Sequence, residues 1–211
     1  MESQVRGGTR WKRFAVVMVP SVAATAAIGV ALAQGALAAS FSVSGQQFKV
    51  SADKLTGTGF SQYGAYDEGV GGNHAVAVSA FDKATIKNLC QSVVTPNIPL
   101  VGTVTLRLEA GDSEDTKKQV KADQLYIDIA DLEADATFKD IDIGVAAGTI
   151  DKGPGIKSGD HASAGGFAQQ ANRAVLTDVE QTAWATTAGT FKLSGLHMSL
   201  KKGAGEGVEC Y

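Results

Sequence analysis

The sequence predicts a mainly β protein, a sandwich or curled antiparallel sheet after an N-terminal apolar export helix. The strongest observation is the stretch from Val120 to Gly144, where apolar and polar residues alternate with a period of two. This period places apolar side chains on one face of a strand and acidic ones on the other. The second observation is a composition with many glycines and alanines and only 7% aromatic residues, which suits thin sheets with tight turns.

The N-terminal residues have the pattern of an export signal. A basic region precedes an uncharged run from Phe14 to Ala33, and the small residues Ala36 and Ala38 follow it. The basic residues are Arg6, Arg10, Lys12 and Arg13. We therefore expect residues 1–38 to form a signal peptide or signal anchor, and residues 39–211 to form a single β-rich exported domain.

The uncharged run leaves two outcomes open. It is longer than the usual signal-peptide core of roughly 7 to 15 residues and reaches the lower limit for spanning a bilayer. Cleavage after Ala38 would release a secreted protein, whereas a retained segment would anchor the protein in the membrane through residues 14–33. In both cases the domain is extracytoplasmic, because the basic residues stay inside.

The exported part is acidic. The chain has 19 basic and 22 acidic residues, of which four and one lie in residues 1–38, so the remainder carries a net charge of −6. Nucleic acid is therefore disfavoured as a partner, because phosphate binding requires a clustered basic surface. The length of the remainder suffices for one domain with a hydrophobic core.

Patterns of period two predict further strands along the chain. Loops are expected from Gly111 to Lys118 and from Gly148 to Gly166. The segment from Leu55 to Tyr66 is expected to form turns packed by aromatic residues, and Gly166 to Asn172 a helical turn. The expected strands are Phe41 to Val50, Ala75 to Phe81, Ala84 to Val94, Val101 to Leu108, Val175 to Trp184 and Thr190 to Leu200.

The acidic stretch from Val120 to Gly144 changes its apolar parity near Asp131 and again before Ile141. Each change predicts a turn or a β-bulge. Asp131, Glu133 and Asp135 share one parity and could present carboxylates to Ca²⁺. Because a strand spaces carboxylates of one face too far apart for a calcium cage, we expect a solvated acidic face and neither a metal nor another cofactor.

A weak internal repeat keeps a β-solenoid as the alternative fold. The segments Ala84–Leu89, Ala136–Ile141 and Ala174–Val179 share a small residue, then an apolar one, then Asn or Asp two positions later. Such a pattern can recur when β units stack. The spacings between the copies are unequal, so we favour the sandwich or curled sheet.

Cys90 and Cys210 are the two cysteines of the chain. Because thiols outside the cytoplasm are usually oxidised, we expect a disulfide between them, the alternative being two buried thiols. Counting by twos places Cys90 on the same strand face as Ala84 and Ile86. The bond would pin the glycine-rich tail and bring the strand from Thr190 to Leu200 beside the strand that carries Cys90.

No complete catalytic motif is present in the sequence. The segments Gly59–Tyr63 and His161–Gly165 approach the G-x-S-x-G elbow of serine hydrolases, but the first lacks the last glycine and the second lacks the first. The elbow needs both glycines because strand and helix pass too close for a Cβ atom. Ester hydrolysis by Ser61 or Ser163 is therefore an alternative to a non-enzymatic role.

Four aromatic residues are candidates for contact with an apolar ligand or a partner. Phe60, Tyr63 and Tyr66 lie in a glycine-rich segment, and Trp184 lies in the run from Gln181 to Ala188. Together they could line an apolar slot. The alternative is that they pack in the core, as most aromatic residues do.

The motifs Gly59–Gly64, Leu89–Val93, Gln181–Phe191 and the terminal Glu209–Cys210 carry a family resemblance that extends over nearly the whole chain. The chain resembles a family of actinobacterial exported proteins of unknown function, which automated labelling often calls cholesterol esterase. Relatives are often encoded beside a small multi-pass membrane protein. The resemblance therefore implies a partner in the cell envelope.

The sequence thus favours a non-enzymatic, extracytoplasmic cell-envelope protein. Such a protein would bind an apolar ligand or lipid, or dock on a membrane-protein partner. The alternatives are a lipid-ester hydrolase resembling cholesterol esterase and a structural surface protein.

Overall fold

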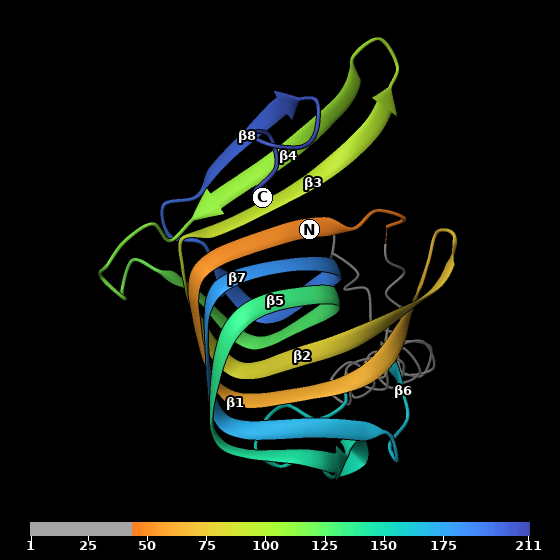
Figure 1. Cartoon of the computed structure of the whole chain (residues 1–211), viewed down its shortest axis with the longest axis vertical. Helices are drawn as coiled ribbons and strands as arrows, with labels where there is room; N and C mark the ends of the chain where they lie inside the picture. The colour runs from red at the N-terminus through yellow and green to blue at the C-terminus, as the bar shows by residue number, and fades with distance from the viewer. Residues whose placement is uncertain (1–43) are drawn as a thin grey trace, which may run out of the picture. The chain divides into compact units, whose positions relative to one another are not determined.

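The computed structural model of the protein describes residues 44–211, and the expected export segment at residues 1–38 lies outside this part. Its eight strands form one antiparallel sheet (Figure 1). The elements are β1 Phe48–Gly69, β2 Gly72–Lys87, β3 Leu89–Ile98, β4 Gly102–Ala110, β5 Val120–Ala146, the 3-10 helix η1 Ala147–Thr149, β6 His161–Ala162, β7 Phe167–Lys192 and β8 His197–Lys202. The predicted curled antiparallel sheet is confirmed. The solenoid is wrong, because antiparallel neighbours replace stacked repeats.

Four of the strands close into a ring. β2 pairs with β5, β5 with β7, β7 with β1, and β1 returns to β2. β1 can join both ends because residues 48–52 pair with β7, while the strand from Lys54 onward pairs with β2. Figure 1 shows the long strands bending at one side of the molecule, so that each contributes to both layers.

Residues in the left-handed conformation interrupt the strands. Within residues 44–211, six non-glycine residues have a positive φ, and four of them are Asn or Asp, the types that tolerate this conformation best. In β5 the pairing with β7 shifts between Ile129 and Asp131, and Asp140 has a φ of 55°. Both lie where the sequence predicts a parity change, so these predictions are confirmed. The irregularities allow β5 to bend.

The inside of the ring holds the main hydrophobic core. Phe60 is at its centre, with its ring centroid 5.4 Å from that of Phe81 and 5.0 Å from that of Phe138. Small residues make room for the large side chains of this core, and an added Cβ on Gly57 would lie 2.1 Å from the ring of Phe81 on the neighbouring strand. Buried alanines on the other strands have the same role, among them Ala84, Ala122, Ala171, Ala174 and Ala183.

The segment of residues 147–166, which we call the cover loop, lies against the outer face of the ring. It begins with η1 and includes β6, which pairs with Ala65 and Tyr66 of β1. A second, smaller core forms beneath it, with Tyr63, Val78 and Ala168 among its buried residues. Within residues 44–211 no helix has the length and apolar composition to cross a membrane.

Two local expectations are wrong. The segment from Leu55 to Tyr66 lies within β1, and residues 166–172 are mostly in β7 and contain no helical turn. The glycines that suggested turns have other functions in a strand. Gly57 makes room for Phe81, and Gly59, with a φ of 64°, lies where a Cβ would be 2.0 Å from the carboxylate of Asp82.

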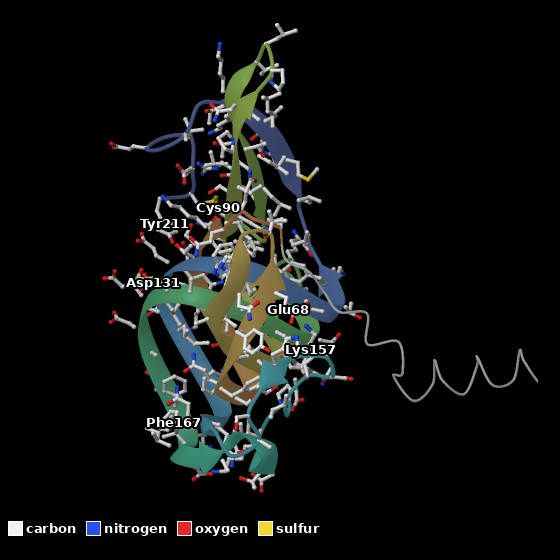
Figure 2. The ribbon with its side chains drawn as sticks, turned by 90° about the vertical axis from the view of Figure 1, so that its right-hand side faces the viewer. Glu68, Cys90, Asp131, Lys157, Phe167 and Tyr211 are labelled. Carbon is white, nitrogen blue, oxygen red and sulfur yellow. A yellow bond between two sulfur atoms is a disulfide. The ribbon has the colours of Figure 1, made fainter. Side chains whose placement is uncertain are left out.

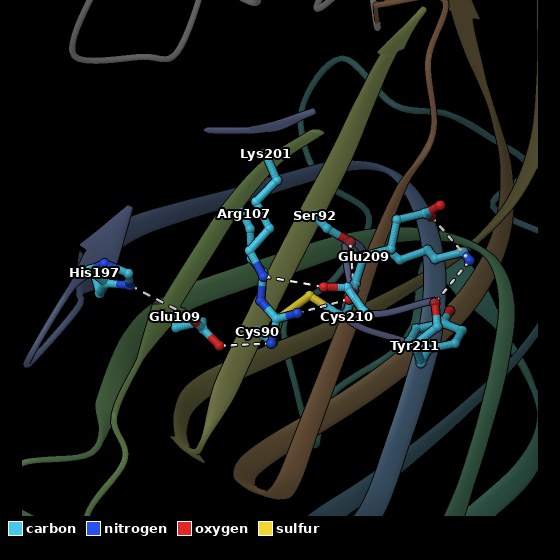
Figure 3. Close-up of a disulfide and its surroundings, with 11 residues drawn as sticks. Cys90, Ser92, Arg107, Glu109, His197, Lys201, Glu209, Cys210 and Tyr211 are labelled. Carbon is cyan, nitrogen blue, oxygen red and sulfur yellow. Dashed lines mark hydrogen bonds and ion pairs between the residues drawn. A yellow bond between two sulfur atoms is a disulfide. The ribbon is translucent and has the colours of Figure 1, made fainter. Parts of the chain in front are cut away.

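β3, β4 and β8 form a three-stranded extension of the ring, which we call the wing (Figure 1). It continues the sheet because residues Leu89 to Val93 of β3 include the pairing partners of β1. After β8, the chain returns across the wing, and Cys210 forms a disulfide with Cys90, as predicted (Figure 3). The amide of Cys210 also donates to Ser92 Oγ at 3.1 Å.

Hydrogen bonds and an ion pair hold the tail beside the disulfide. The guanidinium of Arg107 donates to the backbone carbonyl of Glu209 at 2.9 Å, and Lys49 Nζ lies 3.1 Å from the carboxylate of Glu209 (Figure 3). Lys49 also donates to the carbonyl of Tyr211 at 3.0 Å. Charged groups from β1 and β4 thus converge on the last residues of the chain.

The strand adjacency inferred from the disulfide is wrong. β8 pairs with β4 and not with β3, and the tail bridges the remaining distance to Cys90. The expected face of Cys90 is wrong as well, since Leu89 and not Cys90 joins Ile86 in the core. Asn88, with a φ of 53°, interrupts the alternation of side chains between the two faces of the strand.

Replacing both cysteines with alanine should lower the free energy of unfolding by roughly 2 to 5 kcal/mol, because the bond closes a long loop in the unfolded chain. The two cysteines are 120 residues apart. Urea denaturation followed by tryptophan fluorescence measures the change. Limited proteolysis should also cut residues 203–211 faster in the variant.

The control is Ser92→Ala, which removes the hydrogen bond from Cys210 and leaves the disulfide in place. It should cost about 1 kcal/mol. Equal denaturation midpoints for the double variant and the wild type would contradict a stabilising disulfide.

Candidate functional site

A cavity of about 180 Å³ lies inside the ring, between its two layers. Its walls are mainly apolar and come from all four ring strands. They include Leu55 and Phe60 of β1, Phe81 of β2, Ile127 and Phe138 of β5, and Leu176 of β7. A cavity of about 150 Å³ can hold benzene, so the volume is sufficient for a small apolar group. The cavity is not enclosed, because Leu132 and Ala136 of its wall are exposed.

The shape of the cavity follows from the bend of β5. Beyond the bend, Leu132, Ala134, Ala136 and Phe138 share one strand parity and line the cavity together. Alanine side chains fill little of the space between the layers, and the neighbouring backbone is held by pairing with β7. The two alanines therefore contribute to the open volume.

A short hydrogen-bonded chain of polar side chains forms part of the lining. Gln169 donates from Nε2 to Gln62 Oε1, and Gln62 donates from Nε2 to Ser79 Oγ at 2.7 Å. Ser79 and Gln181, which also line the cavity, are 4% and 6% exposed. With its oxygen accepting from Gln62, the Ser79 hydroxyl can donate its proton to a carbonyl or hydroxyl group in the cavity.

A smaller cavity of about 30 Å³ adjoins the first and shares four lining residues with it. Gln91 of β3 and Phe191 near the end of β7 complete part of its wall. Its lining therefore reaches from the interior of the ring to the base of the wing. The shared residues are Leu55, Ile127, Val179 and Gln181.

A separate polar cluster lies on the outer face of the ring, under the cover loop. The hydroxyl of Tyr63 donates to Asp160 Oδ2 at 2.7 Å and accepts from the backbone N–H of Lys157 at 3.1 Å. The ammonium of Lys157 lies 3.7 Å from Asp160 and 5.8 Å from the ring centroid of Tyr126. Figure 2 shows Lys157 on the side of the molecule away from Asp131.

The pKa values of two acids in this cluster, the buried Asp128 and the half-buried Asp67, are raised. Burial raises the pKa of Asp128 to about 7, and the nearby carboxylate of Asp67 adds to the increase. The pKa of Asp67 is also raised, mainly by burial and then by Asp160. Asp128 Oδ1, Asp67 Oδ2 and His74 Nε2 are buried and have no hydrogen-bond partner in the described part of the chain. The cluster therefore favours neutral carboxyl groups.

Asp128→Asn should stabilise the protein at pH 8 and leave it nearly unchanged at pH 4. The folded pKa lies above the unfolded value, so the neutral acid contributes stability at low pH that is lost as the pH rises through about 7. Between pH 4 and pH 8, the effect of the substitution on the free energy of unfolding should change by roughly 2 to 4 kcal/mol. Thermal unfolding of both proteins across this pH range measures it, with the exposed Asp131→Asn as control. An effect independent of pH would contradict the argument.

The structure separates the four aromatic candidates. Phe60 lines the cavity, whereas Tyr63 and Trp184 belong to the core beneath the cover loop. Trp184 stacks on His74 with ring centroids 3.7 Å apart. Tyr66 is 38% exposed and stacks on His161 at 4.5 Å, so the four do not form one slot.

Sequence reasoning missed the polar residues of the cavity, Gln62, Ser79, Gln169 and Gln181. A signal was present for Gln62, because it shares its strand parity with the apolar Phe60 and therefore points inward. A polar residue on an apolar face needs a hydrogen-bond partner. The identity of that partner depends on pairing between distant strands.

The structure also shows where the serine and acidic candidates lie. Ser61 is fully buried, and its hydroxyl donates to the carbonyl of Pro154, whereas Ser163 is exposed on the cover loop. The acids Asp131, Glu133 and Asp135 are exposed. Within residues 44–211, no group of three or more His, Cys, Asp or Glu side chains could hold a metal ion.

The fold and the cavity define a small antiparallel β protein with a closed four-stranded ring, an apolar interior and a projecting wing. The chain belongs to a family of unknown function, DUF6230, whose profile matches residues 44–211. The description of that family states no activity. Neither the curated proteins nor the solved structures include a match to this chain.

Proposed function

We propose that this protein is a non-enzymatic, extracytoplasmic component of the cell envelope that binds an apolar ligand in the ring cavity. The observation that carries the proposal is a partly open cavity of about 180 Å³ between the layers of the ring, with aromatic and aliphatic walls and polar side chains in its lining. A ligand of this kind would place a ring or the end of an acyl chain against Phe60 and Phe138. A carbonyl or hydroxyl group of the ligand would accept or share the proton of Ser79.

The energetics favour a small apolar ligand or part of a larger one. Each methylene removed from water contributes about 0.8 kcal/mol, and filling an empty cavity adds van der Waals contacts that its walls otherwise lack. The cavity is smaller than the roughly 300 to 1,000 Å³ of drug-sized sites. A lipid would therefore insert one chain end and leave the rest outside, and the adjoining smaller cavity lies on the side of the wing.

Two features support a location outside the cytoplasm. Residues 1–38 have the composition of an export signal, and disulfides persist mainly in oxidising compartments. The burial of Ser61 supports the non-enzymatic part of the proposal, because a nucleophile must reach its substrate. A membrane-protein partner would bring the domain close to a source of lipid.

Ala134→Phe should weaken binding of the neutral fluorophore 1-N-phenylnaphthylamine, because the new ring would occupy the cavity that Ala134 lines. The loss of contacts equivalent to two methylenes weakens binding roughly tenfold. Fluorescence titration of the full chain measures the dissociation constant, and native mass spectrometry of the purified protein shows any apolar ligand that it retains.

The matched control is Ala130→Phe, which adds the same ring at an exposed position of the same strand. It should leave the dissociation constant unchanged. An equal effect of both variants, or no binding by the wild type, would contradict the cavity as the site. Turnover of a fluorogenic acyl ester that disappears in Ser61→Ala would instead support the hydrolase alternative.

A further inference from the structure

The two faces of the wing differ. The returning tail covers one face, where Thr105 Oγ1 donates to the carbonyl of Gly203 at 2.7 Å and the side chain of Arg107 contacts Glu209. Because side chains alternate along a strand, the other face carries the neighbours of Thr105 and Arg107 along β4 and the residues that pair with those neighbours. In the described part of the chain, no strand or loop pairs with β8 on its outer edge.

The uncovered face of the wing is apolar in the two rows nearest the ring, and Lys202 lies on the same face beside Val104, nearer the tip. Strand pairing aligns its side chains in two rows across the sheet, and these rows begin inside the ring. The first row is Val50, Gln91, Leu108 and Met198, and the second is Phe48, Val93, Leu106 and Leu200. Exposure is 7% at Val50, 58% at Met198 and 67% at Leu200, so the inner face of the ring continues outward as an open apolar surface.

The tip of the wing is apolar as well. The hairpin between β3 and β4, residues 95–103, contains no charged residue. Leu100 at this tip is fully exposed and has a φ of 68°, and Val101 is 48% exposed. A leucine in the left-handed conformation is uncommon and is held there by its surroundings at an energetic cost. The hairpin thus presents two aliphatic side chains to its environment.

Two lysines lie immediately behind the tip. Lys202 pairs with Val104 and Lys201 with Thr105, so they are two and three residues from Gly102 along the strand direction, or roughly 7 to 10 Å. Lys202 is exposed, and Lys201 donates to the carbonyl of Gly207 at 3.3 Å. The nearby tail contributes one exposed acid, Glu206. This end of an otherwise acidic domain is therefore basic.

We propose that the wing docks on a lipid surface with anionic headgroups. Leu100 and Val101 enter the boundary between headgroups and acyl chains, and Lys201 and Lys202 contact the headgroups. Interfacial segments bury their apolar side to a depth of roughly 5 to 10 Å, which matches the separation between the tip and the lysines. Each lysine near an anionic surface adds to the attraction.

The chemistry of the wing favours a membrane over another protein chain. A partner that adds a strand would need the edge of β8, but this edge is short and ends in two lysines, features that oppose strand addition. A lipid surface requires no matching backbone groups.

The test uses the full chain with Leu100→Cys, labelled with an environment-sensitive fluorophore. Cys90 and Cys210 are bonded to each other, so the new thiol is labelled selectively. Addition of vesicles of phosphatidylcholine and phosphatidylglycerol should shift the emission of the fluorophore to the blue. Quenchers attached to the acyl chains should then reduce its fluorescence. Vesicles of phosphatidylcholine alone should give a smaller shift.

The matched control is Val70→Cys, because Val70 is 73% exposed in the turn of another hairpin, between β1 and β2. Attachment of the chain to vesicles through some other segment does not require the label at Leu100 to enter the bilayer. The proposal therefore predicts a shift at position 100 and none at position 70. Replacing Lys201 and Lys202 with glutamine should weaken partitioning roughly fivefold for each lysine.

Three results would overturn the proposal. They are an emission at position 100 that stays unchanged with anionic vesicles, an equal shift at both positions, and partitioning that is insensitive to the lysine substitutions. The first would leave the wing as a surface for a protein partner. Ligand binding in the ring cavity is measured separately with the Ala134→Phe variant, so failure of docking and failure of the cavity are distinguishable.

Discussion

The change of partner along β1 is the constraint on which the rest of the structure depends. Residues 48–52 pair with β3 on one side and β7 on the other, and from Lys54 the strand pairs with β2. This single strand therefore closes the ring and also attaches the wing. Closure of the ring leaves few open edges among its strands. The inner face of the ring must then be filled by side chains or leave a cavity.

Closure also gives the ring two chemically different faces. The inner face is filled by aliphatic and aromatic side chains, with Gln62 and Ser79 satisfying each other. The outer face carries Asp128, which strand alternation points away from the core, and the cover loop removes this acid from water. The raised pKa of Asp128 therefore follows mainly from its burial, and Asp67 of the ring strand β1 adds to the increase.

Local features of the fold could be predicted from the sequence, and pairing between distant strands could not. The bulges of β5 could be predicted from the parity changes within its own residues. The disulfide could be predicted from the expected export and from the presence of two cysteines. The glycines between Leu55 and Tyr66 predict turns, but Gly57 instead supplies space for Phe81, a contact that exists only after β1 and β2 pair. Of the four aromatic candidates, Phe60 lines the cavity, and the hydrogen-bonded glutamines of the cavity depend on the register between strands.

The wing and the cavity are consequences of one continuous sheet face. Val50 pairs with Gln91, so the parity that points inward in the ring points to the uncovered side of the wing. A sheet whose face is buried at one end and open at the other exposes apolar area to water, at about 25 cal/mol for each Å². The rows lead from the wing to the base of the ring, where Gln91 is the one polar side chain of the two rows and also lines the smaller cavity.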